Sequence, residues 1–322
     1  MKYSYYPGCS LEKNAAAYDL STRAIAGPLG MELVEIDDWN CCGATEYLAL
    51  NMTASYSLIA RNLAQAAKNE GVDEIMAPCS ACYLNLRKCD KYMGLKNGLA
   101  DRVAEALAAG GLSYQAGSLR VRHLLDVVYH DIGVDQLAEK TTRPLYGLKL
   151  APYYGCMVVR PDFGNGSDST EDPVSLDRIL QALGAEVVDY PCKTDCCGGH
   201  MTQISEEAGF ELIRRLIKGA ADAEADAIVT LCPMCQLNLD GFQAAMNRHF
   251  GTSYHVPVLY FTQVIGLAMG MAPRSLGIGQ EMVSAVDALA KIGSAPPPEP
   301  VHPARRRRGD RSLPMPSPRV EA

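Results

Sequence analysis

Two pairs of neighbouring cysteines are the residues of this sequence whose types and spacing most directly indicate metal or redox chemistry. Cys41 and Cys42 stand in "NCCGA", and Cys196 and Cys197 stand in "DCCGG". Neighbouring cysteines rarely bond to each other, because the peptide between them would be strained. Two such thiolates also crowd a single zinc ion, whereas they can reach neighbouring irons of one polynuclear cluster.

Each adjacent pair belongs to a set of five thiols. The first set comprises Cys9, Cys41, Cys42, Cys79 and Cys82, and the second comprises Cys156, Cys196, Cys197, Cys232 and Cys235. A structural zinc site takes four ligands, typically from two CxxC pairs, so a fifth thiol beside a single CxxC favours a multi-iron cluster. We interpret the two cysteines outside the sets, Cys89 and Cys192, as small buried hydrophobes or bystanders.

Each CxxC follows a predicted strand and opens a predicted helix. Residues three apart share one face of a helical turn, and the unpaired N–H groups at a helix N-terminus lower a thiol pKa and donate to thiolate or sulfide. A lone CxxC could instead be a thioredoxin-like redox pair. Two copies within the same five-cysteine pattern favour metal, and Gly43 and Gly198 would let the backbone pass close to an inorganic core.

The elements that must position these thiols occur twice, so the chain is a duplication. "GMELVEI" parallels "GAEVVDY", "DEIMAPCSACYLNL" parallels "DAIVTLCPMCQLNL", and "LRVRHLLDVV" parallels "VPVLYFTQVI". In the first half the patterns predict helices over 15–30 and 45–71, and strands over 32–36 and 72–78. Alternating strands and helices predict an α/β fold in which each half has a mainly parallel sheet with flanking helices.

Four segments follow from this pattern. We expect one repeat over 1–143, the second over 144–272, a C-terminal helical segment over 273–293 and a disordered, proline- and arginine-rich tail over 294–322. The apolar stretch from Val256 is interrupted by Pro257, Thr262 and Gln263, so it predicts a short strand and a core helix instead of a transmembrane segment.

Composition narrows the function. The net charge of −7 argues against general nucleic-acid binding. The N-terminus "MKYSYYPGCS" has no apolar signal region, so we expect a cytoplasmic protein, in which clustered cysteines more often hold metal than form structural disulfides. Neither GxGxxG nor a P-loop is present, so electrons must arrive from another protein.

The two motifs, C–x31–CCG–x35–CxxC and C–x39–CCG–x33–CxxC, resemble the CCG domain found in the B subunit of heterodisulfide reductase, over residues 1–272. The resemblance implies two CCG domains related by pseudo-two-fold symmetry. It also implies that each five-cysteine set binds one noncubane [4Fe-4S] cluster, so that all ten cysteines are cofactor-binding metal ligands. The tail has no counterpart in that family.

An oxidoreductase that acts on sulfur groups is the activity that the resemblance implies. Two adjacent clusters would each deliver one electron to a small disulfide, or take one from its thiols. The partners would be a flavin-containing A subunit and a ferredoxin-like C subunit. No acid–base pair is evident; His200 is the titratable side chain placed to give a proton, and Arg87, Lys88 and Lys193 are candidates to bind an anionic substrate. A surface role is the alternative for all four.

Three alternatives stay open. Similar CCG-domain proteins transfer electrons to quinones or oxidases without cleaving a disulfide, although these often keep only one intact cysteine set. Bacterial sulfur-oxidising complexes use similar subunits, and the proline- and arginine-rich tail favours a bacterial setting of that kind. A structural zinc protein is the remaining class, which metal analysis would distinguish.

Overall fold

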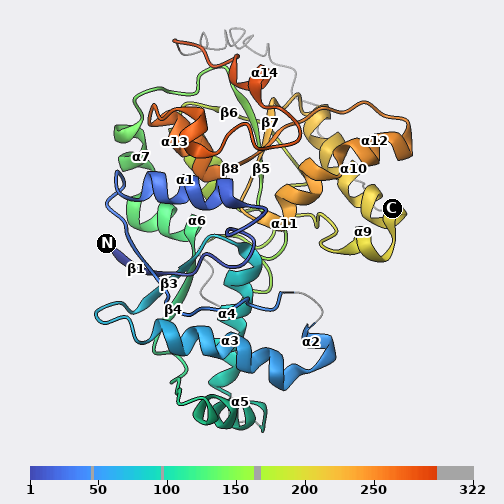
Figure 1. Ribbon diagram of the computed structural model, residues 1–322. Helices are drawn as coiled ribbons and strands as arrows, with labels where there is room; N and C mark the ends of the chain where they lie inside the picture. Colours follow the sequence, from blue (N-terminus) through green and yellow to red (C-terminus); the bar gives the residue numbers. More distant parts are fainter. Residues whose placement is uncertain (45–46, 96–97, 163–167, 296–322) are drawn as a thin grey trace, which may run out of the picture.

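A computed structural model describes residues 1–295 apart from 45–46, 96–97 and 163–167, and the predicted tail lies almost entirely outside the described residues (Figure 1). Two four-stranded sheets organise the chain. The first contains β1 (Lys2–Tyr5), β2 (Glu32–Glu35), β3 (Glu74–Ala77) and β4 (Arg120–His123), and the second contains β5 (Lys149–Tyr153), β6 (Glu186–Val187), β7 (Ala227–Thr230) and β8 (Val258–Tyr260).

Both sheets have the same topology. Their strand orders are β2-β1-β3-β4 and β6-β5-β7-β8, and every pairing is parallel. A parallel sheet covered on both faces requires apolar strands, and the four residues of β7 are accordingly all buried. The predicted duplicated α/β fold with mainly parallel sheets is therefore confirmed.

The helices of the first half are α1 (Ala16–Ala26), α2 (Tyr47–Leu50), α3 (Met52–Ala66), α4 (Ser80–Met93), α5 (Gly98–Ala109), α6 (Leu124–Val127), the π-helix η1 (Val128–Ile132) and α7 (Val134–Lys140). The second half has α8 (Ser175–Ala182), α9 (Met201–Ile204), α10 (Glu206–Asp222), α11 (Pro233–Gln236), the π-helix η2 (Leu237–Gly241), α12 (Gln243–Phe250) and α13 (Phe261–Ala268). The 3-10 helix η3 (Pro273–Leu276) and α14 (Val286–Leu289) follow.

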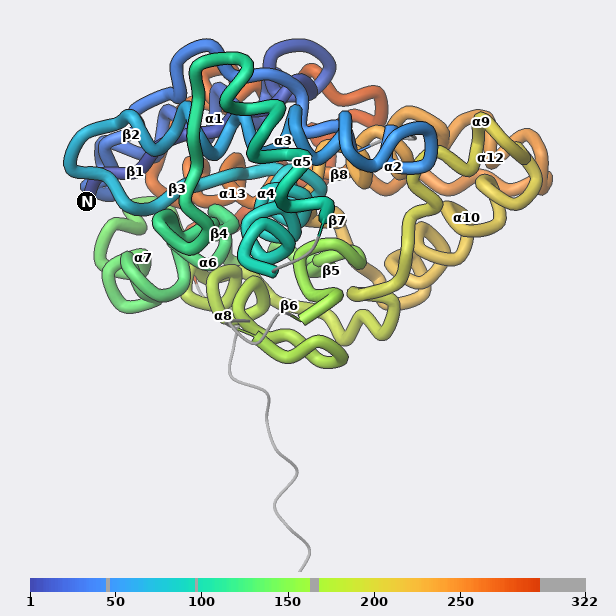
Figure 2. Tube along the Cα trace, turned by 90° about the horizontal axis from the view of Figure 1, so that it is seen from below, coloured from blue at the N-terminus to red at the C-terminus, as the bar shows by residue number. Residues whose placement is uncertain are grey.

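The two halves pack by exchanging equivalent contacts. Helix α1 of the first half lies against α13 of the second (Figure 1). In the same way α8 of the second half lies against α6 of the first (Figure 2), and it also contacts η1. A buried hydrogen bond between Ser21 Oγ and Thr262 Oγ1, 2.7 Å long, joins α1 to α13. The reciprocal packing brings both sheets into one hydrophobic core.

One predicted element is wrong in its extent. The single helix expected over 45–71 is interrupted, since α2 ends at Leu50 and α3 begins at Met52. Asn51 has extended backbone, and its side chain accepts a hydrogen bond from the Ala54 N–H at 2.9 Å. A side-chain cap of this kind starts a new helix and ends the old one. The strand and core helix predicted from Val256 are present as β8 and α13.

Candidate metal centres

Both cysteine sets lie at the carboxyl ends of their sheets. Cys9 follows β1, the adjacent pair follows β2, and Cys79 caps the helix α4 that follows β3; the second half repeats the arrangement after β5, β6 and β7. In both strand orders the second strand lies on one side of the first strand, and the third lies on the other side. Open parallel sheets bind ligands outside the carboxyl ends of their strands at such a switch point. The topology therefore gathers residues that are distant in sequence.

The thiols of the first set contact one another. Cys9 Sγ lies 3.4 Å from Cys41 Sγ, and Cys42 Sγ lies 3.4 Å from Cys82 Sγ. Cys79 and Cys82, the two ends of the CxxC, also interact. The structure thus brings the five predicted cysteines of the first half together.

The second set repeats these contacts and meets the first. Cys156 interacts with Cys196, and Cys235 interacts with both Cys197 and Cys232. Cys232 also interacts with Cys79 of the other half. The two CxxC segments therefore approach each other where the halves meet, and the Ser80 hydroxyl of the first donates at 3.4 Å to the Leu231 carbonyl beside the second.

Two side chains in each half hold the backbone beside the adjacent cysteines. The Tyr6 hydroxyl donates to the Asn40 carbonyl at 2.6 Å, and the Tyr153 hydroxyl donates to the Asp195 carbonyl at 2.8 Å. Asn85 and Asn238 donate to the carbonyls of Cys42 and Cys197, both at 3.1 Å. These four residues were not predicted as site residues, although each lies at the same distance from a cysteine in both copies.

Glycines allow the backbone to approach the sulfurs. A Cβ on Gly8 would lie 2.8 Å from Cys82 Sγ, and one on Gly155 would lie 3.1 Å from Cys235 Sγ. Gly43 and Gly198 have positive φ, and their N–H groups donate to Cys41 Sγ at 3.4 Å and Cys196 Sγ at 3.3 Å. Glycine is required because any larger residue would be strained in this conformation.

Thiol–thiol contact shifts the pKa values of the cysteines apart. Hydrogen bonds from Cys42 and Cys9 lower the pKa of Cys41, and a hydrogen bond from Cys156 lowers the pKa of Cys196 to about 6. The hydrogen bond between Cys9 and Cys41 raises the pKa of the Cys9 thiol. Metal ligation requires thiolate, so a bound cation would displace the protons of these thiols.

These donors fit an iron–sulfur cofactor better than a single ion. A single tetrahedral ion would need four of these thiols gathered around one point. The sulfurs instead form chains of contacts, and six of the ten thiols are buried: Cys42, Cys79, Cys82, Cys197, Cys232 and Cys235. An all-thiol donor set with N–H groups directed at sulfur suits a polynuclear cluster.

The remaining predicted residues have varied surroundings. His200 lies half-buried at the start of α9, three residues after Cys197, and its role as a proton donor stays a prediction. Arg87 donates to the Tyr83 hydroxyl, and Lys88 is half-buried on α4. Lys193 pairs with Asp172 at 2.6 Å and with Asp177 at 3.5 Å. Two carboxylates already oppose the Lys193 charge, which disfavours it as the anion-binding residue.

Comparison with known proteins identifies the duplicated unit. The family model for the CCG cysteine-rich domain matches residues 3–87 and 150–240, which is one copy in each half. The chain belongs to the CCG cysteine-rich domain family. The resemblance found in the cysteine motifs is thereby confirmed.

Its relatives are redox subunits. The chain is 35% identical to the 8-methylmenaquinol:fumarate reductase membrane anchor subunit of Wolinella succinogenes, over 88% of this chain and 98% of the relative. It is 32% identical to the B subunit of the ferredoxin/F420H2-dependent CoB-CoM heterodisulfide reductase of Methanosarcina acetivorans, over 90% and 97% of the two chains. The family and these relatives support an iron–sulfur oxidoreductase subunit as the class of this CCG-domain chain.

A solved structure shares the fold. A hypothetical protein from Helicobacter pylori superposes with a TM-score of 0.68 and 14% identity, covering 88% of this chain and 52% of that one. At this identity the likeness concerns the fold alone. In the described part of this CCG-domain chain, no helix is long and apolar enough to cross a membrane.

Proposed function

We propose that this chain is the catalytic iron–sulfur subunit of a heterodisulfide reductase-like complex. It reduces a disulfide, or reversibly oxidises the corresponding thiols. The observation that carries the proposal is the approach of the two CxxC segments where the halves meet: the Ser80 hydroxyl of the first segment donates at 3.4 Å to the carbonyl of Leu231, which directly precedes Cys232. Cleavage of one S–S bond takes two electrons, and two adjacent one-electron centres match that requirement.

Each cysteine set would hold one [4Fe-4S] cluster, of the noncubane type implied by the family. The first half supplies Cys9, Cys41, Cys42, Cys79 and Cys82, and the second supplies Cys156, Cys196, Cys197, Cys232 and Cys235. When bound, such clusters supply one-electron transfer and iron atoms with affinity for sulfur.

The chain's own residues position the site and exclude water from its inner side. Tyr6, Tyr153, Asn85 and Asn238 fix the backbone of the adjacent cysteines. The cysteines of both CxxC segments are buried, whereas Cys9, Cys41 and Cys196 are exposed. A substrate or partner therefore approaches from the side of the adjacent pairs.

The net reaction converts one disulfide, two electrons and two protons into two thiols. The electrons come from partner subunits, for which we propose a flavin-containing A subunit and a small ferredoxin-like C subunit. The protons come from solvent or from His200, whose imidazole follows the second adjacent pair. A cytoplasmic location of the complex stays a prediction.

A second candidate function is supported by the 35% identical relative, which is named for a quinol:fumarate reductase. In this alternative the chain transfers electrons between a quinol and a partner enzyme without cleaving a disulfide. Both functions use the same ten cysteines, so the donor set does not separate them. A sulfur-oxidising complex is the reverse direction of the first function.

Metal analysis followed by reoxidation tests both. After anaerobic purification we expect about eight irons with matching acid-labile sulfide per chain, that is, two four-iron clusters. The reduced protein is then mixed with low-molecular-weight disulfides or with a soluble menaquinone analogue. Reoxidation by disulfides alone supports the reductase, and reoxidation by the quinone alone supports electron transfer. Zinc without sulfide would overturn the redox function altogether.

A further inference from the structure

A buried tyrosine bridges the two CxxC segments. Tyr18 of α1 is fully buried, and its hydroxyl lies 3.0 Å from the Pro78 carbonyl and 3.3 Å from the Leu231 carbonyl. These carbonyls belong to the residues that directly precede Cys79 and Cys232. One hydroxyl therefore contacts the residue that precedes each CxxC segment, at the place where the two segments approach each other.

A second connection crosses the same boundary. Ser80, inside the first CxxC, lies 3.4 Å from the Leu231 carbonyl of the second half and 3.4 Å from His123 Nε2. The Leu125 N–H donates to His123 Nδ1 at 3.0 Å, so the ring is neutral with its proton on Nε2. The hydrogen bonds then run in one direction: His123 Nε2–H donates to Ser80 Oγ, and the Ser80 hydroxyl donates to the Leu231 carbonyl.

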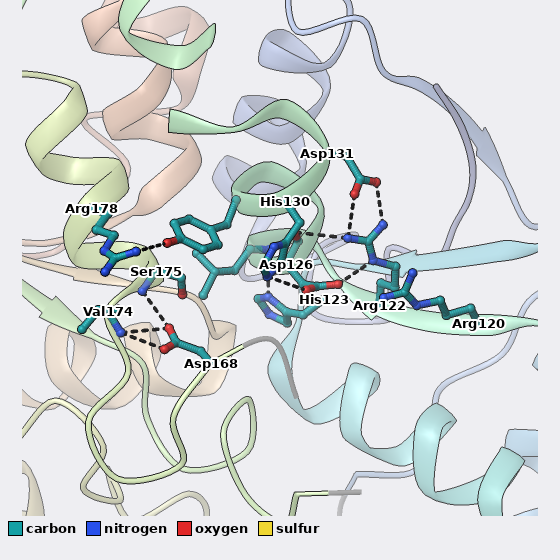
Figure 3. A network of polar contacts seen from close by, with 12 residues as sticks. Arg120, Arg122, His123, Asp126, His130, Asp131, Asp168, Val174, Ser175 and Arg178 are labelled. Carbon is teal, nitrogen blue, oxygen red and sulfur yellow. Dashed lines mark hydrogen bonds and ion pairs between the residues drawn. The ribbon is translucent and has the colours of Figure 1, made fainter. Parts of the chain in front are cut away.

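The surroundings hold this array in place. Tyr18 stacks on Tyr260 with ring centroids 4.2 Å apart, and both rings lie in the interface between the halves. The neighbour of His123, Arg122, is buried and donates to Asp131 at 2.9 Å (Figure 3). It also donates to Glu74 at 3.1 Å, and the two contacts fix the end of β4. Side chains with so little freedom give a defined separation between the groups they connect.

The second half has different residues at the positions that form this array. Pro233 stands in the second CxxC where Ser80 stands in the first, and Tyr260 ends β8 where His123 ends β4. Proline has no hydroxyl or N–H to donate. The hydrogen bonds between the halves therefore serve the pair of CxxC segments as a unit and not each cysteine set separately.

We propose that Tyr18, Ser80 and His123 are positioning residues that fix the separation of Cys79 and Cys232, and through it the electronic coupling between the two cofactors. This inference rests on the proposed function, because it requires two clusters. It concerns how the sites communicate, which the ligand set alone does not determine.

The test compares Tyr18→Phe and Ser80→Ala with Tyr114→Phe as the matched control. Tyr114 also loses one hydroxyl, but that hydroxyl donates to Asp90 near the far end of α4. Each full-length variant is purified anaerobically, assayed for iron and sulfide, and examined by electron paramagnetic resonance when both clusters are paramagnetic. We expect Tyr18→Phe and Ser80→Ala to keep their iron but to lose or narrow the splitting that arises from the neighbouring spin, and Tyr114→Phe to retain it.

The outcomes separate the two proposals. Unchanged splitting in both variants at full iron content, or no splitting in the parent protein with two clusters bound, would overturn the inference and leave the proposed function standing. A parent protein without iron would overturn the proposed function itself. If Tyr18→Phe does not fold, Ser80→Ala carries the test, since it changes a small side chain and leaves the stacked Tyr18 and Tyr260 unaltered.

Discussion

The two halves agree closely beside the adjacent cysteine pairs and differ further out. Tyr6 and Tyr153 make the same hydrogen bond, as do Asn85 and Asn238. Beyond them, Asn62 is fully buried in the first half and is joined to Asn40 by two hydrogen bonds, one from the Asn40 N–H at 2.8 Å and one to its carbonyl at 3.0 Å.

The equivalent position of the second half is occupied by a different kind of residue. Arg215 takes the place of Asn62, since each lies twelve residues before the next strand, and its side chain is exposed. A cavity of about 190 Å³ is bounded there by Asp195, Cys196, Leu212, Arg215 and Leu216. The residues beside the adjacent cysteines are thus the same in both halves, whereas the residues further out differ and make the two sites unequal in their access to solvent.

The largest effect is expected from removing a buried sulfur of either set. Cys82→Ser and Cys235→Ser should each lower the iron content by about four atoms per chain, because each removes a thiolate from one of two separate clusters. Iron and sulfide analysis measures the loss. Cys89→Ser, at a buried cysteine outside both sets, should keep all the iron. Full iron in either of the first two variants would contradict the ligand assignment.

Alanine at the glycines beside the CxxC cysteines should destabilise the halves unequally. Gly8, Gly155 and Gly30 all have positive φ, but only a Cβ on Gly8 or Gly155 would meet a sulfur, and Gly30 has open space. Gly30→Ala should cost about 1–2 kcal/mol of unfolding free energy from backbone strain alone. Gly8→Ala should cost about 1–3 kcal/mol more from the clash with Cys82 Sγ. Gly155→Ala should fall between them, and denaturant unfolding measures all three.

Equal losses at the three glycines would mean that backbone conformation, and not the approach to sulfur, requires glycine at these positions. A loss confined to Gly8→Ala and Gly155→Ala would instead assign the whole effect to the sulfur contact.

The equivalent asparagines should also differ. The Asn238 amide donates to two carbonyls, those of Cys197 at 3.1 Å and Gly199 at 2.8 Å. The Asn85 amide donates to one, that of Cys42. Asn238→Ala should cost about 2–3 kcal/mol and Asn85→Ala about 1–2 kcal/mol, since each leaves buried carbonyls without a donor. Asn69→Ala, which loses a contact to Ser4 Oγ away from the sulfurs, is the control for the measured unfolding free energies. A larger loss for Asn85→Ala would reverse the comparison.

Local spacing made part of this site predictable from the sequence. The position of a cysteine after a strand can be read from the sequence, so the parallel sheets and the gathering of the ten cysteines could be predicted together. Their role as metal ligands stays a prediction. The tyrosines and asparagines also carried a signal, because "YPGC" and "YYGC" share a tyrosine three residues before the cysteine, and "CYLNL" and "CQLNL" share an asparagine three residues after it. Aligning the two repeats residue by residue would have found Asn85 and Asn238.

The approach of the two CxxC segments to each other could not be predicted in this way. It depends on how α1 packs against α13, and no periodicity in either half encodes the relative placement of two sheets. The break at Asn51 was missed for a different reason: the apolar spacing continues across it, and only the side-chain hydrogen bond to Ala54 decides that a new helix begins.

The smallest effect should come from the positions further from the sulfurs, where the halves differ most. Asn62→Ala removes both hydrogen bonds to Asn40 and should cost about 1–2 kcal/mol of unfolding free energy, because buried backbone groups lose their partners. Arg215→Ala changes an exposed side chain and should stay within about 0.5 kcal/mol of the parent. Urea unfolding of the two variants measures the difference. Equal losses would show that both positions matter only as parts of their helices. The hydrogen bonds between Asn62 and Asn40 would then contribute nothing to the stability of the segment around Cys41.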